Sequence, residues 1–485
     1  MTNSRPNIIY LFSDQHRHDA MGCAGNPVIQ TPNLDKMASE GVRFSRTYCQ
    51  SPICQPSRAS VITGLYTHQH GIPGNIKSFD PAWPTMMKRL KDRGYYTAEF
   101  GKTHFECGAQ LGKVGLQPSN KIGLDLRENE AFIRSFGFDE VMEEFDRYAH
   151  AMPNVKSHYT EYLREKGRLE AYRDQIKSVW RLTPNHWDAQ TSVLPQEDDL
   201  TAFTADRAID WLNGYKGEQP FFMMVSFVAP HVPLIADPIW AEYYQEAQIP
   251  RGPRIPPTKP NDVWGARIDD MHKHSQSQLL TDEYVLNGAR QYYGMVSLID
   301  QRIGDIIRAV EEKGWADNTY LVYSADHGEM LGDHNLMAKM QFYKSSVLVP
   351  AIIRPPHGMA AKVVDGITES IDLTASILDI AGAEPIEDSW ARSLLHFLEG
   401  NRPGRDVAFS AIQRGRTDSD YYYVMAATER YRLTIEARTD TDCELFDLYE
   451  DPDEENNLVN DPGYQGIIED IRKDYLQSYL ALGKI

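Results

Sequence analysis

Residues 319–328 read TYLVYSADHG. The run before the aspartate carries no charge, so it predicts a strand that is buried on both faces, as in parallel sheets. The strand ends at Asp326 and His327, which offer a hard oxygen ligand and an imidazole, and Gly328 allows a tight turn after them. This stretch predicts a layered α/β fold with a polar site where a buried strand ends.

Three other predicted strands end in the same way. Residues 8–12 precede Asp14, residues 95–100 precede Lys102 and His104, and residues 221–228 precede His231. In open α/β sheets, binding sites lie beyond the carboxyl ends of the strands. We therefore expect these polar side chains to converge on one crevice.

The segments around these strands alternate with predicted helices. Helices are expected at 31–39, 84–93, 200–212 and 372–381, with a long helix over 283–313 that has a candidate break near Gly294, and residues 347–354 add another strand. The alternation predicts an α/β fold with a large, mostly parallel sheet flanked by helices.

The C-terminal part of the chain has a different pattern. Strand-like runs at 407–412, 421–427 and 431–435 predict a small antiparallel sheet, which a helix from about residue 464 follows. We divide the chain into a catalytic domain, residues 1–400, and a C-terminal subdomain, residues 401–485. Residues from about 108 to 200 and from 250 to 280 lack clear periodicity and are predicted to be insertions or lid segments.

The composition excludes several classes of protein. With 485 residues, 41% hydrophobic, including 26 Tyr, 17 Phe and 8 Trp, the chain is neither fibrous nor disordered. It has no run of about 20 apolar residues that would span a membrane. Its 50 Lys and Arg against 69 Asp and Glu give a net charge of −19, which argues against a nucleic-acid partner.

Cysteine use and the N-terminus bear on the compartment. Five cysteines, an odd number, form no disulfide framework and no zinc spacing; they are Cys23, Cys49, Cys54, Cys107 and Cys443. The apolar run at 8–12 is too short for a signal peptide. We expect a cytoplasmic protein, or a periplasmic one if a leader was removed.

Residues 54–64 read CQPSRASVITG. Taken alone, they predict a buried Cys54 ahead of a helix that Ser57 caps and that starts near Arg58. A nucleophile needs a fixed position and a positive neighbour, and Arg58, one turn along, meets the second need.

The segment resembles the signature C-x-P-S-R-x-x-x-[LI]-T-G of type I, formylglycine-dependent sulfatases in the alkaline phosphatase superfamily, and it matches every defined position. Five other segments resemble the same family: Asp14-Gln15, GKTH at 101–104, PHVP at 230–233, residues 324–339 and residues 444–458. The resemblance runs from about residue 6 to 458. It implies an alkaline phosphatase-like fold: a large mixed, mostly parallel sheet flanked by helices, and a small C-terminal antiparallel sheet with a helix.

The resemblance also implies a nucleophile and a metal site. Cys54 is expected to be oxidised to formylglycine by a maturation enzyme, and its hydrated aldehyde to attack sulfur. Asp14, Gln15, Asp326, His327 and the converted Cys54 are expected to hold one divalent ion, Ca²⁺ first, with Mg²⁺ or Mn²⁺ as alternatives. Many family members have Asp where this chain has Gln15, so the site here has one negative charge fewer.

Further roles follow from the same resemblance. Lys102 and Lys339 are expected to bind the sulfate oxygens, and Arg58 to orient the formylglycine. His231 is the expected general acid, assisted by Lys339, and His104 the expected base in the second step.

The sequence therefore predicts a sulfatase that hydrolyses sulfate monoesters, with arylsulfatase-type activity. A phosphonate monoester or phosphodiester hydrolase of the same superfamily is one alternative, and the GKTH element favours the sulfatase. An inactive member kept for binding is the other. The expected partners are a small sulfate ester, the maturation enzyme and a second copy of the chain, with neither nucleic acid nor membrane.

Overall fold

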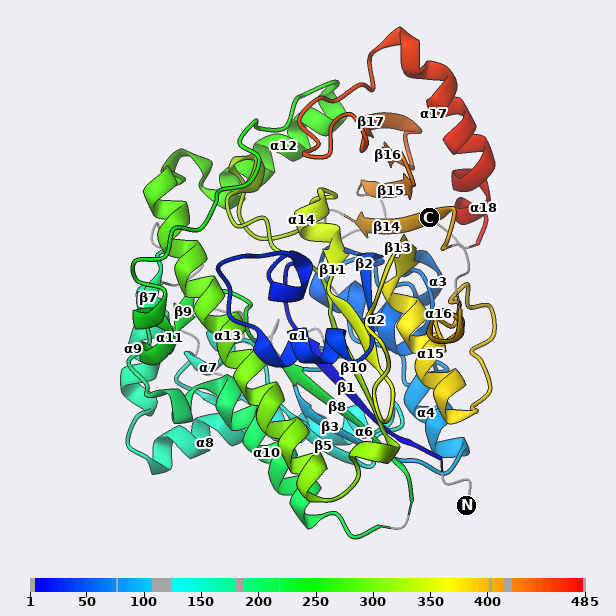
Figure 1. Cartoon of the computed structure of the whole chain (residues 1–485). Coiled ribbons are helices and arrows are strands. Elements are labelled where there is room, and N and C mark those ends of the chain that lie inside the picture. The colour runs from blue at the N-terminus through cyan, green and yellow to red at the C-terminus, as the bar shows by residue number, and fades with distance from the viewer. Residues whose placement is uncertain are drawn as a thin grey trace.

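The computed structural model describes residues 5–75, 77–106, 124–179, 186–217, 219–400, 404–413 and 421–482. Helices flank a nine-stranded sheet on both faces, and a separate four-stranded sheet lies toward the C-terminus (Figure 1). The predicted fold class is confirmed.

Five neighbouring strands of the large sheet are parallel. In sheet order they are β10 (Thr319–Ala325), β1 (Asn7–Ser13), β8 (Phe221–Phe227), β3 (Tyr96–Gly101) and β5 (Glu140–Glu143). Four of them are the strands that the sequence predicts, and β5 falls in the segment predicted to be an insertion. The rest of the sheet is β12 (Ala351–Arg354), β2 (Val42–Tyr48), β11 (Leu348–Val349) and β13 (Lys362–Glu369), of which β12 and β11 run antiparallel to β2.

The register makes the parallel strands end together. Ser13 pairs with Ala325 on one side and Phe227 on the other, and Gly101 pairs with both Ser226 and Glu143. The residues that follow these strands therefore emerge at one edge of the sheet, as the sequence predicts.

Two apolar layers cover the sheet. Alternate residues of β1 point to opposite faces: Ile9 and Leu11 pack with α10 (Leu200–Gly214) and α13 (Asp282–Glu312). Ile8, Tyr10 and Phe12 pack on the other face with α2 (Cys54–Thr63), α4 (Met86–Asp92) and α15 (Ser370–Ala381).

The helix α13 is continuous, so the predicted break near Gly294 is wrong. A Cβ at Gly294 would lie 2.7 Å from the Cβ of Ala236. The glycine therefore permits close packing of α13 against the neighbouring chain and does not interrupt the helix.

The segments predicted to be insertions contain regular structure where they are described. Their helices are α6 (Glu130–Arg134), α7 (Arg147–His150), α8 (His158–Glu165), α9 (Leu169–Ser178) and α12 (Asp262–Ser275). Tyr159 and Leu163 of α8 and Ile176 of α9 are buried in the same apolar cluster as α10 and α13. The remaining short elements are α1 (Pro32–Ser39), α3 (Thr67–His70), α11 (Pro238–Tyr243), α14 (Lys344–Val347), α16 (His396–Glu399), β4 (Leu124–Asp125), β6 (Val155–Lys156), β7 (Gln190–Thr191) and β9 (Ile235–Ala236).

The C-terminal sheet is antiparallel, as predicted. Its strands, in order, are β14 (Val407–Gln413), β15 (Tyr422–Thr428), β16 (Tyr431–Glu436) and β17 (Thr441–Asp447). The helices α17 (Gln465–Ile471) and α18 (Gln477–Leu480) share an apolar cluster with it. Among the described residues, no helix has the length and apolar character needed to cross a bilayer.

Candidate active site

Cys54 is the first residue of α2, all ten residues of which are buried. The predicted cap is wrong, because the helix begins at Cys54 and Ser57 lies inside it. The Ser57 hydroxyl donates to the carbonyl oxygen of Asp326 instead. This bond fastens the first turn of α2 to the end of β10, so the Cys54 side chain faces the strand ends.

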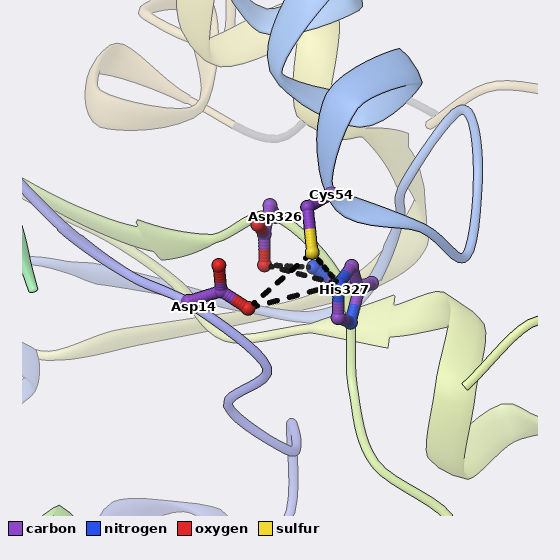
Figure 2. A group of neighbouring side chains, drawn as sticks. All are labelled: Asp14, Cys54, Asp326 and His327. Atoms are coloured by element: carbon purple, nitrogen blue, oxygen red, sulfur yellow. Dashed lines mark hydrogen bonds and ion pairs between the residues drawn. The ribbon is translucent and has the colours of Figure 1, made fainter. Parts of the chain in front are cut away.

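Four ligand atoms meet at this point (Figure 2). Side-chain atoms of Asp14, Cys54, Asp326 and His327 all lie within 4.8 Å of one another, and all four residues are buried. The Cys54 Sγ lies 3.2 Å from His327 Nε2 and 3.7 Å from Asp14 Oδ1. His327 Nδ1 contacts the Gly328 carbonyl oxygen at 2.9 Å, which leaves Nε2 directed at the cluster. Two carboxylates and an imidazole around one point are a donor set that fits a divalent cation.

Arg58 bonds both carboxylates of the cluster. Its Nε donates to Asp326 Oδ2 at 2.8 Å and its Nη2 to Asp14 Oδ2 at 3.2 Å. Its Nη1 donates to Ser226 Oγ at 3.0 Å and to the Lys102 carbonyl oxygen. The guanidinium therefore fixes the ends of β1, β10, β8 and β3 relative to one another.

Lys102 contacts the same cluster. Its Nζ donates to Asp14 Oδ2 at 2.6 Å. The preceding Gly101 has a φ of +118°, and a Cβ there would lie 2.0 Å from the Ser226 carbonyl oxygen. Only glycine fits this close approach, which turns the chain so that Lys102 faces Asp14.

Lys339 and Gln15 contact each other next to the cluster. The Lys339 ammonium donates to Gln15 Oε1, and Gln15 Nε2 donates to Glu329. The amide oxygen predicted to bind metal is thus engaged by Lys339 here, and its role as a ligand stays a prediction. Lys339 also acts on Cys54, because its positive charge partly offsets the rise that burial causes in the pKa of the thiol.

The two site histidines are held differently. His231 Nδ1 contacts the Val232 carbonyl oxygen at 2.8 Å, which leaves Nε2 for the site. His104 has a φ of +59°, and its Nδ1 has no hydrogen-bond partner among the described residues. Burial and nearby Lys339 lower the pKa of His231, and burial and Lys102 lower that of His104, in each case well below the usual value. Both rings are therefore neutral near pH 7.

The charges of the site also shift its acidic groups. Burial would raise the pKa of Asp14, yet Lys102 and the other nearby cations hold it well below its usual value. Burial raises the pKa of the Cys54 thiol to about 11, and Asp14 adds to the rise. Without a bound cation, Cys54 is therefore a neutral thiol and not a thiolate.

Sequence reasoning missed the end of β5. Glu143 and Phe145 contact the segment that carries Lys102 and His104. Their only signal in the sequence is the apolar pair Val141–Met142 followed by two glutamates, inside a stretch without periodicity.

Comparison with known proteins decides the family. The family model described as Sulfatase matches residues 6–383, and one described as N-sulphoglucosamine sulphohydrolase, C-terminal, matches residues 332–479. The chain belongs to the sulfatase family. This sulfatase is 28% identical over 489 residues to an arylsulfatase of Clostridium perfringens, a match that covers 97% of this chain and 93% of that protein.

Two further relatives match over nearly their whole length. A multifunctional alkaline phosphatase superfamily protein of Trinickia caryophylli is 27% identical over 518 residues, which cover 99% of this sulfatase and 95% of the relative. The crystal structure of the phosphonate monoester hydrolase of Agrobacterium radiobacter superposes with a TM-score of 0.77 at 24% identity, covering 99% and 95%. The predicted family is confirmed, and with it the predicted class of enzyme, a sulfuric ester hydrolase.

Proposed function

We propose that this sulfatase hydrolyses small, singly sulfated esters, with formylglycine made from Cys54 as nucleophile and one divalent cation held by Asp14, Asp326 and His327. The observation that carries the proposal is the convergence of Cys54 on these three ligand atoms. The cations around the cluster suit a sulfate group, because they neutralise charge on its oxygens.

The environment of Cys54 supports its conversion. A cysteine nucleophile works as the thiolate, and burial raises the pKa of this thiol to about 11. The nearby imidazole of His327 is directed at the ligand cluster and is itself a metal ligand candidate, so it is not free to act as a base. We propose that a maturation enzyme converts Cys54 to formylglycine, whose hydrated aldehyde carries two hydroxyls: one attacks sulfur, and loss of the proton of the other expels sulfate and returns the aldehyde.

The donor set supports a hard cation. With oxygen in place of sulfur at position 54, the cluster offers mainly oxygen ligands, which favours Ca²⁺ over softer metals, with Mg²⁺ or Mn²⁺ as alternatives. When bound, the cation supplies positive charge that lowers the pKa of a hydroxyl at position 54. Gln15 contributes a neutral oxygen if it turns from Lys339.

The protein's own side chains bind the sulfate, orient position 54 and transfer a proton to the leaving group. Lys102 and Lys339 bind the sulfate oxygens, while Arg58 holds Asp14 and Asp326 in place and orients position 54. His231 gives its Nε2 proton to the departing alcohol, assisted by Lys339. The bound anion offsets the Lys339 charge that lowers the pKa of His231, so substrate binding favours the protonated ring.

In the second half of the reaction, His104 acts as the base. Its pKa lies well below the usual value, because burial and Lys102 disfavour the charged ring. A neutral imidazole with an unpartnered Nδ1 is suited to accept the proton whose loss lets sulfate depart.

The experiment has two parts. Mass spectrometry of the peptide that contains Cys54, after expression with a maturation enzyme, should show the thiol replaced by an aldehyde. Hydrolysis of a panel of sulfate esters by metal-depleted and metal-restored enzyme should require both the aldehyde and the cation. Full activity with unmodified Cys54, or without divalent metal, would contradict the proposal.

A phosphonate monoester hydrolase is the second candidate. The fold similarity to such an enzyme and the neutral Gln15 beside Asp14 favour it. Rates on an aryl sulfate and on a phenyl phosphonate ester, compared in one preparation, distinguish the two. We expect the sulfate to be the better substrate, because the GKTH element at 101–104 resembles that of the sulfatases.

A further inference from the structure

The end of β5 supports the segment that carries Lys102 and His104. We propose that Glu143 and Phe145 are positioning residues that hold these two side chains in their working places. The proposal rests on the roles proposed above for Lys102 and His104, and it concerns a strand end that the sulfatase motifs of this chain do not include.

Glu143 holds the backbone of the segment. Its carboxyl group is buried, which raises its pKa to about 8, and its two oxygens accept the N–H of Thr103 at 3.0 Å and that of His104 at 3.5 Å. His104 has a φ of +59°, in the left-handed region, so its conformation persists only where the surroundings fix it. Loss of the carboxyl group would leave buried N–H groups without an acceptor and favour another arrangement of the turn.

Phe145 holds the side chains. Its ring lies edge-to-face with the His104 ring, with centroids 4.9 Å apart and an interplanar angle of 81°. The Lys102 ammonium lies 5.6 Å from the centroid of the same ring. One buried ring therefore contacts the proposed base and the proposed sulfate ligand at once, through an aromatic and a cation–π interaction.

Glu144, between these two residues, also contacts the segment 101–104. The Glu144 N–H donates to the Gly101 carbonyl oxygen at 2.6 Å, next to the last pair of the ladder between β3 and β5, Gly101 with Glu143. Three consecutive residues thus contact the four-residue segment 101–104 through three different chemical groups. Packing alone would require only apolar bulk at these positions, whereas these contacts depend on a carboxyl group, an N–H and an aromatic ring.

The test compares matched variants of the full, matured enzyme. Glu143→Ala should lower kcat/KM by about 100-fold, the order expected when catalytic groups are misplaced by about 1 Å, and Glu143→Gln, which keeps an acceptor oxygen, should recover most of the loss. Phe145→Leu should lower kcat/KM about tenfold. The control is Phe203→Leu, because Phe203 is buried in the same apolar cluster but contacts neither Lys102 nor His104. It should lower Tm without changing kcat/KM.

Two outcomes are decisive and separate. Wild-type kcat/KM in Glu143→Ala and Phe145→Leu, with Tm lowered as in the control, would overturn the positioning roles and leave the proposed function intact. If the wild-type enzyme hydrolyses no sulfate ester, the proposed function fails. The positioning of His104 is then still tested by the NMR signal of its ring, which is assigned by comparison with His104→Gln. That signal should move in Glu143→Ala, although Glu143 bonds only to the backbone of His104, and an unmoved signal would overturn the proposal.

Discussion

Replacement of Arg58 by methionine tests how the site keeps two carboxylates in a buried place. The Arg58 side chain is fully buried and makes ion pairs with Asp326 at 2.8 Å and Asp14 at 3.2 Å. Methionine keeps the apolar stem and removes the charge. In the described part of the chain, Asp14 then retains Lys102, while Asp326 has no lysine or arginine within ion-pair distance.

The size of the effect follows from these contacts. Removal of one partner from a buried ion pair costs about 3–5 kcal/mol. A chain of 485 residues unfolds with an entropy of about 1 kcal/mol per kelvin, at roughly 2.1 cal/mol/K per residue, so Tm should fall by about 3–5 °C. Because we also propose that Arg58 orients position 54, we expect kcat/KM to fall by about 10²–10³-fold, as for loss of other preorganised donors.

The assay is differential scanning fluorimetry of the full chain, combined with hydrolysis of an aryl sulfate under metal saturation. Arg432→Met is the matched control, because Arg432 is equally buried and bonds Glu444 and Glu454 away from the site. It should lower Tm by a similar amount and leave kcat/KM unchanged. An Arg58→Met enzyme with the Tm and kcat/KM of the wild type would refute the charge argument.

Three shorter predictions concern the chemistry. Cys54→Ala should abolish turnover while circular dichroism shows an intact fold, and residual hydrolysis near the wild-type rate would contradict the nucleophile assignment. Chelation of divalent metal should abolish activity and lower Tm, because a cation that binds only the folded protein stabilises it, and Ca²⁺ should restore both. For alkyl sulfates, kcat/KM should fall as pH rises above the pKa of His231, which lies below its usual value, because only the protonated ring donates a proton to the leaving alcohol. Aryl sulfates, whose leaving groups need less protonation, should show a flatter pH profile. His231→Gln should remove this difference between the two substrate classes.

The sequence predicted the parts of the fold where local and long-range preferences agree. β1, β8 and β10 are uncharged, mainly apolar runs that are buried almost throughout, so composition alone locates them. β2 was missed because its two arginines, Arg43 and Arg46, are only partly buried and interrupt its apolar pattern, and β13 because a register shift between Val364 and Ile367 interrupts its pairing. Their partners in the sheet come from distant parts of the chain, and no local pattern encodes that pairing.

The candidate site was also predictable only where a local pattern in the sequence encodes it. Asp14, Lys102, His231 and Asp326 could be grouped beforehand, because each follows a recognisable strand, His231 by four residues and the others directly, and parallel strands end at one edge. The cap assigned to Ser57 was wrong, because the hydroxyl has a tertiary partner, the Asp326 carbonyl oxygen, which only the folded chain brings near. Local capping preference yields to such a contact when the helix end is buried.

The net charge of −19 and the substrate anion are compatible because the relevant charges are local. Arg58, Lys102 and Lys339 outnumber Asp14 and Asp326, so the site has a formal charge of 3 − 2 = +1 before a cation binds and +3 with a divalent one. At physiological salt, charges farther away than about 8 Å are largely screened, so the acidic surface acts little on a bound sulfate. It does oppose a polyanion that spreads over the surface. The same count applies to a phosphonate monoester, which is also a monoanion, so net charge does not select sulfur over phosphorus. On the roles proposed for Lys102 and His104, we expect the end of β5 to bear on specificity as well as on rate. Glu143→Ala should then lower kcat/KM for the sulfate ester more than for the phosphonate, and an equal loss for both esters would contradict that expectation.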